Sequence, residues 1–360
     1  MKTTKFNLSL FLIFGLIPNF LTAQLSEKKL ATIDSIMDAY IAEHDVPAIS
    51  LGIVSDGKTY FLNKGFYKRD EEKPMDEMGA GQIASLSKSF TGIIIKELLA
   101  AGQLDVNRSI IDYLPKGYDV KIKAKLKGIT VRELLHHRSG FPRDSKIASG
   151  KRKGNDPLIY DYTEADFALD FKQIRIKKNP KREFEYSNFA YAVLGYIAER
   201  ASGQSYENLL QQYICQPYQL SHTTTKVPSV SEKVTPYYKE DRQRETQHFV
   251  MGKLTPPSGI FSTSEDLCKL LKQQLQVYTA DQRQHALYLT EDALPKNGPA
   301  YGYGLFDYGN GGLGHGGDLD GYATNYWLYP EHSLGYAFLT SSGGAWVHSF
   351  ALAVEAVLLK

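Results

Sequence analysis

Strand-like segments at both ends of this 360-residue chain enclose a mainly helical middle, and this arrangement limits the fold more than any other feature. Near the start, Ala48 to Val54 and Thr59 to Asn63 are joined by an Asp-Gly turn of the type that closes hairpins. Near the end, Thr324 to Tyr329 and Leu334 to Thr340 form a second strand-like pair. We therefore expect one antiparallel sheet built from the two ends of the chain.

Helical patterns occupy most of the remaining sequence, separated by Gly, Pro or Asp signals. The sequence thus predicts an α+β fold. Residues of about 24–100 and 255–360 would form the antiparallel sheet and its flanking helices, and residues of about 101–254 a large, mainly helical insertion beside a cleft. The expected helices are Leu30–Ala42, Phe90–Ala100, Val131–Leu135, Tyr191–Ala201, Tyr206–Tyr213, Ser264–Val277 and about Ala345–Leu359.

The first 23 residues have the features of a secretory signal peptide. Lys2 and Lys5 precede a short apolar run, Leu8 to Leu21, and small residues end at Ala23. A membrane anchor is the alternative, but the run contains Pro18 and is short for a span of about 20 apolar residues. We expect an exported protein, periplasmic or secreted, with no membrane span after cleavage.

Charge and cysteine content exclude several classes of protein. Without the leader and its two lysines, 40 basic residues face 40 acidic ones, so nothing indicates a nucleic-acid partner. The local basic cluster from Lys172 to Arg182 is interpreted as a solvated face or loop. Cys215 and Cys268 are too few for a zinc framework, and their apolar surroundings favour buried free thiols over a disulfide.

Ser85 and Lys88 stand at the start of a helix that is apolar around nearly its whole circumference. A serine in the first turn lies near free N–H groups that stabilise negative charge, and a lysine three residues later can reach its hydroxyl. Burial favours a neutral amine, which can act as a base toward a nucleophile. The pattern S-x-x-K alone is weak, because it recurs at Ser26 and Ser55; a plain helix cap is the alternative for Ser85.

Two further short motifs are candidate partners. Tyr186-Ser187-Asn188 follows a charged loop and precedes a helix, so its tyrosine could lend a phenolate base and Asn188 could orient lysine and substrate. Y-x-N also occurs at Tyr206 and Tyr308, and ordinary packing of Tyr186 is the alternative.

His315-Gly316-Gly317 lies in a glycine-rich run before the last strand pair, where glycines let a backbone approach a ligand closely. The N–H groups of Asp318 and Ser85 could then form an oxyanion hole. A flexible loop with a solvated histidine is the alternative.

The order of these motifs resembles the serine beta-lactamase and penicillin-binding protein family, in its branch of class C-like beta-lactamases, esterases and D-aminopeptidases. The resemblance extends from about Leu30 to the C-terminus. Other stretches similar to the family are residues 129–142 (ITVRELLHHRSGFP), 259–267 (GIFSTSEDL), 301–305 (YGYGL) and 314–321.

The resemblance implies a role for each matching residue. Ser85 would be the acylated nucleophile, Lys88 its proton acceptor and Tyr186 the general base and acid. Asn188 would contact substrate and lysine, and the segment from His315 to Gly317 would be the strand edge that receives substrate. Members of this family have two-part α+β folds and need no metal, so we expect no cofactor.

One departure bears on the substrate. Where classical beta-lactamases have lysine in the third triplet, this chain has His315, which is only partly charged near neutral pH. A missing cation disfavours substrates that carry the antibiotic carboxylate and favours other esters or peptides. Arg143 could supply a substitute charge at the cleft; a solvated surface arginine is the alternative.

Other hydrolase types lack their motifs, since the chain has no G-x-S-x-G and no H-E-x-x-H. We expect an enzyme that transfers an acyl group from a small-molecule or peptide ester or amide to Ser85 and then to water. A penicillin-binding sensor that acylates without turnover and an acyltransferase are the alternatives. The sequence does not indicate an oligomeric state.

Overall fold

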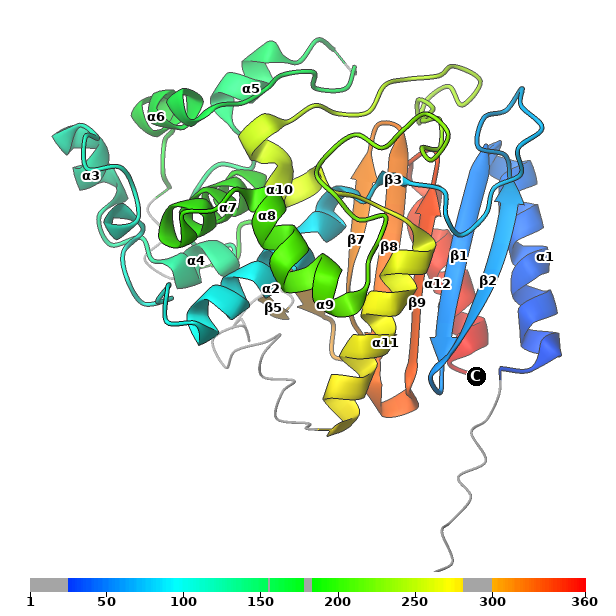
Figure 1. Ribbon diagram of the computed structural model, residues 1–360. Coiled ribbons are helices and arrows are strands. Elements are labelled where there is room, and N and C mark those ends of the chain that lie inside the picture. Colours follow the sequence, from blue (N-terminus) through cyan, green and yellow to red (C-terminus); the bar gives the residue numbers. More distant parts are fainter. Residues whose placement is uncertain (1–24, 155, 178–182, 281–299) are drawn as a thin grey trace, which may run out of the picture.

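In the computed structural model, described for residues 25–154, 156–177, 183–280 and 300–360, a seven-stranded antiparallel sheet joins the two chain ends (Figure 1). The predicted α+β fold is confirmed. The proposed signal peptide lies outside the described residues. In spatial order the strands are β2 (Lys58–Gly65), β1 (Ala48–Ser55), β9 (Leu334–Thr340), β8 (Tyr322–Tyr329), β7 (Leu313–Leu319), β6 (Leu305–Asp307) and β5 (Ala300–Gly302).

The first hairpin forms because its turn residues adopt the conformation that a two-residue loop requires. Asp56 and Gly57 have φ of 47° and 76°, and Ser55 pairs with Lys58 across the turn. Two residues with positive φ match the twist of the flanking strands. Strand β1 then pairs with β9 inside the sheet. This pairing joins residues nearly 300 positions apart, such as Leu51 and Phe338.

Helices cover both faces of the sheet. Helix α1 (Glu27–His44) and helix α12 (Trp346–Leu358) pack together on one face, where Met37 and Phe350 join a cluster with Leu51 of β1. Helix α11 (Ser264–Ala280) packs against β1 and β9 on the other face (Figure 1). Because both faces are covered, all residues of β1, β8 and β9 are buried.

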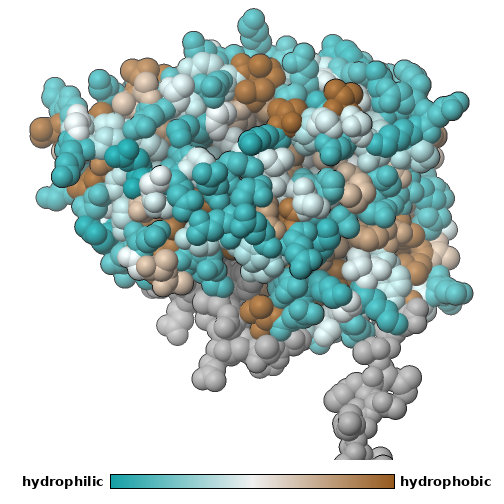
Figure 2. Space-filling model, in the orientation of Figure 1, coloured by the Kyte–Doolittle hydropathy of each residue, from teal (hydrophilic) through white to brown (hydrophobic). Residues whose placement is uncertain are grey.

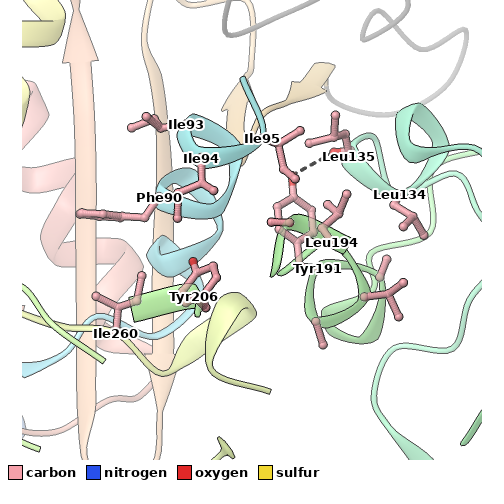
Figure 3. Packing of buried hydrophobic residues seen from close by; sticks show 14 of the residues in the cluster. Phe90, Ile93, Ile94, Ile95, Leu134, Leu135, Tyr191, Leu194, Tyr206 and Ile260 are labelled. Atoms are coloured by element: carbon pink, nitrogen blue, oxygen red, sulfur yellow. Dashed lines mark hydrogen bonds between the residues drawn. The ribbon is translucent and has the colours of Figure 1, made fainter. Parts of the chain in front are cut away.

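The predicted buried helix is α2 (Ser87–Ala100), which lies between the sheet and the helical part of the molecule. Phe90, Ile94 and Leu194 belong to one buried cluster. Figure 3 shows Phe90 pointing from α2 toward the strands and, on the other side of α2, Tyr191 donating a hydrogen bond to the carbonyl of Leu135 at 3.0 Å. The remaining helices are α3 (Val120–Leu126), α4 (Val131–Leu135), α5 (Lys146–Lys151), α6 (Glu164–Gln173), α7 (Asn188–Ser202), α8 (Tyr206–Leu210), α9 (Gln216–Tyr218), α10 (Thr255–Ser258), the 3-10 turns at residues 84–86, 110–112, 252–254 and 330–332, and a π-helical turn at 211–215.

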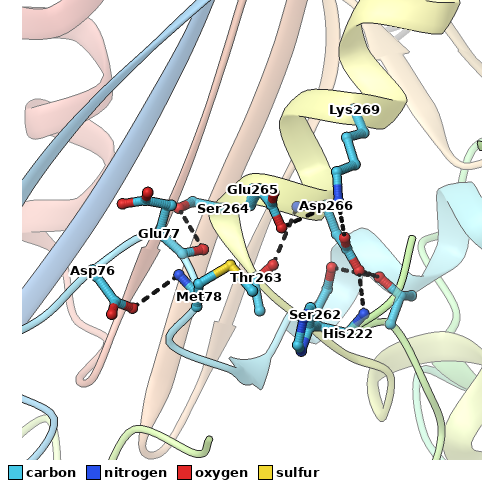
Figure 4. Close-up of polar contacts among 11 residues, drawn as sticks. Asp76, Glu77, Met78, His222, Ser262, Thr263, Ser264, Glu265, Asp266 and Lys269 are labelled. Atoms are coloured by element: carbon cyan, nitrogen blue, oxygen red, sulfur yellow. Dashed lines mark hydrogen bonds and ion pairs between the residues drawn. The ribbon is translucent and has the colours of Figure 1, made fainter. Parts of the chain in front are cut away.

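The start of α11 is fixed by a polar network (Figure 4). Asp266 is fully buried and accepts hydrogen bonds from the His222 N–H at 2.7 Å and the Thr223 hydroxyl at 2.9 Å, while Lys269 lies 3.3 Å away. The preceding strand β4 (Phe261–Ser262) pairs with β3 (Gly81–Gln82), which leads directly to Ser85. The network therefore holds the segment that enters the candidate site.

Two other expectations concern cysteines and membranes. Cys215 and Cys268 are both buried and free. Within the described part of the chain, none of the helices combines the length and the apolar character that a membrane crossing requires. Figure 2 shows that the face seen in Figure 1 is mainly hydrophilic, with apolar residues in small scattered groups.

Candidate active site

Ser85 lies in a 3-10 turn, Ala84–Leu86, that runs directly into α2. We expected it inside the first α-helical turn; the helix begins two residues later, at Ser87. The preceding residue, Ala84, has φ of 49°, which is unusual for a residue with a side chain and is tolerated only where the surroundings enforce it. Ile83 is held on both sides: its N–H donates to Ile260, and its carbonyl accepts from Thr324 of β8 at 2.8 Å.

Lys88 is fully buried, and its amine points at Ser85. The Nζ atom lies 3.2 Å from the Ser85 Oγ and 2.9 Å from the carbonyl oxygen of Pro257. Burial lowers the pKa of Lys88 well below its usual value, and the nearby Arg143 guanidinium acts in the same direction. A neutral amine can donate to the Pro257 carbonyl and still offer its lone pair to the Ser85 hydroxyl.

Tyr186 completes the group of contacts around the serine. Its hydroxyl hydrogen-bonds with Ser85 and lies 3.5 Å from the Nε2 of His315. Its ring lies 4.8 Å from the Lys88 Nζ. The expected phenolate is wrong in this state, because burial raises the pKa of Tyr186 despite the Ser85 hydrogen bond and the Arg143 charge. Tyr186 is therefore a neutral phenol that can donate a proton.

Asn188 begins helix α7, and its side chain is fixed by a residue that sequence reasoning missed. Its Nδ2 donates to Asp144 Oδ1 at 2.7 Å, which fixes the amide orientation because a carboxylate only accepts. Among the described residues, the hydrogen bonds of Lys88 go to Ser85 and Pro257, so the expected contact between Asn188 and Lys88 is not made.

Arg143 fits both interpretations of the sequence. Its side chain is 68% exposed, yet the guanidinium lies 5.2 Å from the centre of the Tyr186 ring and 3.9 Å from Asp144. Its carbonyl oxygen accepts from the Asn188 N–H at 2.7 Å. Arg143 is thus a partly solvated cation on the rim of the site.

His315 lies on β7 and is buried, with 3% of its surface exposed. Its Nδ1 is 2.5 Å from the carbonyl oxygen of Gly316, which only accepts, so Nδ1 carries the proton and Nε2 can accept from Tyr186. Burial lowers the pKa of His315 to about 3. The imidazole is therefore neutral at physiological pH, not partly charged as its ordinary pKa suggested.

The glycine triplet is a strand edge rather than a flexible loop, and Gly317 touches the turn that carries Ser85. A Cβ atom on Gly317 would lie 2.6 Å from the Ile83 carbonyl oxygen and 2.8 Å from the Ala84 Cβ. Asp318 follows, with its carboxylate turned toward Gly343 and accepting from the Gly344 N–H. The oxyanion hole of Asp318 and Ser85 N–H groups stays a prediction.

His137 is a second residue near the site to which the sequence analysis assigned no role. It is fully buried, has φ of 54°, and its Nδ1 accepts from the Ser187 N–H at 3.0 Å. Its ring centre lies 4.4 Å from that of Tyr186 and 4.6 Å from that of Tyr301. His137 thus positions the Tyr186–Asn188 segment through a ring contact with Tyr186 and a hydrogen bond from the Ser187 N–H. No sequence motif predicts these contacts.

A pocket of about 300 Å³ adjoins this group of residues and is bordered by Arg143, Asn188 and Pro257. In the described ranges, no cluster of three or more His, Cys, Asp or Glu side chains could hold a metal ion. The arrangement of a hydroxyl, a neutral amine and a phenol can carry out acyl transfer by acid–base chemistry from protein groups.

Known proteins resemble the chain along most of its length. Protein flp of Staphylococcus aureus is 28% identical over 334 residues, which cover 90% of this chain and 65% of that protein, so the chain spans less than two thirds of that relative. A class C beta-lactamase mutant superposes with a TM-score of 0.77 at 18% identity, covering 93% of this chain and 99% of that one. The D-amino acid amidase of Ochrobactrum anthropi superposes with a TM-score of 0.76 at 21% identity, covering 92% and 99%.

The structural neighbours share the fold. A family model described as Beta-lactamase matches residues 33–357, which includes the Ser85 turn, the Tyr186 segment and strand β7. Such a match over nearly the whole chain establishes membership. The chain therefore belongs to the beta-lactamase family.

Proposed function

We propose that this protein is a serine hydrolase that cleaves an ester or amide bond through an acyl-enzyme at Ser85. The observation that carries the proposal is the contact of the Ser85 hydroxyl with a buried, neutral Lys88 at 3.2 Å. A serine hydroxyl is a weak nucleophile unless an adjacent base takes its proton. Tyr186, bonded to the same hydroxyl, supplies the acid for the second half of the step.

In the proposed acylation, the Ser85 Oγ attacks the substrate carbonyl and its proton passes to the Lys88 amine. The bond to the leaving oxygen or nitrogen then breaks, and Tyr186 gives that atom a proton and regains one from Lys88. In deacylation a water molecule attacks the ester carbon, its proton passes to the same base, and Ser85 leaves with a proton restored.

The neutral His315 supports substrates without a carboxylate at the β7 edge. A buried imidazole with a pKa of about 3 offers no charge to an anion, and the next cation, Arg143, lies on the exposed rim. We expect small esters to react and penicillins to react slowly. Rapid turnover in a beta-lactam panel would contradict this expectation.

The decisive experiment compares wild type with Ser85→Ala in a nitrophenyl ester assay, and intact-protein mass spectrometry follows the acyl adduct. The matched control is Ser26→Ala, because Ser26 has the same S-x-x-K spacing but caps helix α1. The expected result is that Ser85→Ala alone loses both turnover and adduct. Equal rates in both variants would show that Ser85 is not the nucleophile. A burst without turnover would instead favour a sensor, and acyl transfer to an added acceptor would favour a transferase.

We also propose that the protein is exported, on the strength of the leader pattern from Lys2 to Ala23. N-terminal sequencing of protein recovered outside the cytoplasm should begin near Gln24. An intact N-terminus in the cytoplasmic fraction would overturn this proposal.

A further inference from the structure

The pocket beside the nucleophile has a defined position relative to the reacting groups. Asn188, Pro257 and Asp318 are among its lining residues, whereas Ser85, Lys88, Tyr186 and His315 are not. The pocket therefore adjoins the reacting groups through Asn188 and through Pro257, whose carbonyl accepts from Lys88. A volume of about 300 Å³ is at the lower end of the range for ligand pockets. Its lining combines apolar side chains, among them Leu158, Phe249 and Met251, with charged ones at Arg143, Asp144, Arg152, Lys239, Asp318 and Asp320.

This position indicates which part of a substrate the pocket receives. The leaving group must reach the Tyr186 hydroxyl to be protonated, and that hydroxyl faces His315. The acyl group stays bonded to Ser85 and extends to the other side, past Asn188. The apolar part of the lining suits an apolar acyl chain, because each buried CH₂ group stabilises the complex by about 0.8 kcal/mol.

An ion cluster lies farther along β7 from the site. Asp320 follows the last residue of β7, and its side chain is only 6% exposed. It accepts from the Arg152 guanidinium at 2.5 Å, and the Lys239 Nζ lies 3.3 Å from its other oxygen. At about 3.3 Å per residue, Asp320 lies roughly 10 Å along the chain from Gly317, which touches the Ser85 turn.

The cluster connects three segments that are far apart in sequence. Arg152 follows helix α5, Lys239 belongs to the loop before α10, and Asp320 ends β7. Arg152 also donates to the Asp156 carbonyl at 2.9 Å and covers the Phe249 ring at 5.7 Å. All three charged side chains line the pocket, and the nearly buried Asp320 keeps both cations because leaving it unpaired is costly.

We propose that the Arg152–Asp320–Lys239 cluster is the end wall of the acyl pocket and sets the length of the acyl chain that the enzyme accepts. This inference rests on the proposed function, since it assigns the pocket to the group bonded to Ser85. The substrate class is then an ester or amide with a short apolar acyl group. Arg152, Asp320 and Lys239 are specificity-determining residues that do not touch the reacting atoms.

The test measures kcat/KM for nitrophenyl esters from acetyl to decanoyl in wild type, Arg152→Ala and Lys239→Ala. Each variant removes one arm of the wall and leaves Asp320 one partner. Wild type should lose about tenfold or more between hexanoyl and decanoyl esters, and the variants should recover about tenfold on the decanoyl ester only. The matched control is Arg108→Ala, which breaks an exposed ion pair with Asp112 away from the pocket and should keep the wild-type profile.

A second readout does not need turnover. Calorimetry with n-alkylboronic acids, which add reversibly to an active serine, should show the same length limit in wild type and its relief in both variants. Identical profiles in wild type, Arg152→Ala and Lys239→Ala, with Ser85→Ala inactive, would overturn the end wall and leave the hydrolase proposal intact. Activity retained in Ser85→Ala, with no boronic acid bound, would overturn both.

Discussion

The two sides of the active site differ in how far their charged side chains are exposed to water. On the α2 side, Lys88 is fully buried and its amine contacts Ser85 and the carbonyl of Pro257. On the rim, Arg143 and Asp144 are 68% and 52% exposed and interact through a loose contact of 3.9 Å. Burial lowers the pKa of Lys88 on the reacting side, whereas water solvates the two side chains on the rim. In the proposed function, chemistry takes place on the buried side and the exposed rim contributes to recognition.

The largest effect should come from the buried side. Lys88→Met keeps an unbranched side chain of similar length in the apolar site but removes the base, so kcat should fall by about 10³-fold. Lys96→Met on the same helix serves as the control and should retain activity. The role of the buried Lys88 amine as the base is contradicted if Lys88→Met keeps more than a tenth of wild-type kcat while its melting temperature is unchanged.

A smaller effect should follow from separating β7 from the nucleophile turn. Gly317→Ala places a Cβ 2.6 Å from the Ile83 carbonyl oxygen, so the strand or the Ser85 turn must shift. A displacement of about 1 Å can lower a rate by roughly 10²-fold. Gly316→Ala is the matched variant, because its nearest neighbour is 3.7 Å away. Steady-state kinetics should show a much smaller loss for Gly316→Ala; equal losses would mean that close approach is not the cause.

His137 packs against Tyr186 and accepts from the Ser187 N–H, and its variants should change kcat by about tenfold. His137→Phe keeps a ring beside Tyr186 but leaves the Ser187 N–H without its acceptor. His137→Asn places an oxygen near the former Nδ1 and tolerates the positive φ of 54°. We expect Asn to restore most of the kcat that Phe loses, with KM little changed. If Asn is as impaired as Phe, the ring contact and not the hydrogen bond positions Tyr186.

The last prediction concerns stability. Burial depresses the pKa of His137 and His315, so below about pH 6.5 the unfolded chain binds protons that the folded chain cannot. The free energy of unfolding should therefore fall as pH drops from 7 to 5, by at most about 1.4 kcal/mol per pH unit for each histidine. Urea unfolding of His315→Gln should show a shallower pH dependence than wild type. If the free energy of unfolding has the same pH dependence in His315→Gln as in wild type, the His315 imidazole is exposed to water in the folded protein.

The fold was predictable where the local sequence pattern favours the same element that the tertiary structure contains. The Asp-Gly turn predicted the first hairpin, and Leu334–Thr340 and Val131–Leu135 form as expected. The glycine-rich run before β8 lacks the alternation of a strand, so the residue pattern did not predict β7, and only the family resemblance placed His315 to Gly317 on a strand edge. Helix α6 was missed although Thr163 and Asp166 form a capping box, a signal that could have revealed it.

The sequence predicted most residues of the site but not their protonation states or all of their hydrogen-bond partners. Ser85, Lys88, Tyr186 and His315 are brought together, while the parts played by Asp144 and His137 were missed. Those two act through partners 44 and 50 positions away, and no local pattern specifies such contacts. The phenolate at Tyr186 was wrong because its burial could not be read from the sequence.

The α+β class, the pairing of the two chain ends and the order of the three motifs could be read from the residues alone, since these follow from hydrophobic pattern, turn chemistry and residue identity. The protonation states of the site and the end of the proposed acyl pocket became visible only in the folded chain. Protonation depends on how much water surrounds a group, and the end wall depends on three segments, around Arg152, Lys239 and Asp320, that meet only after folding.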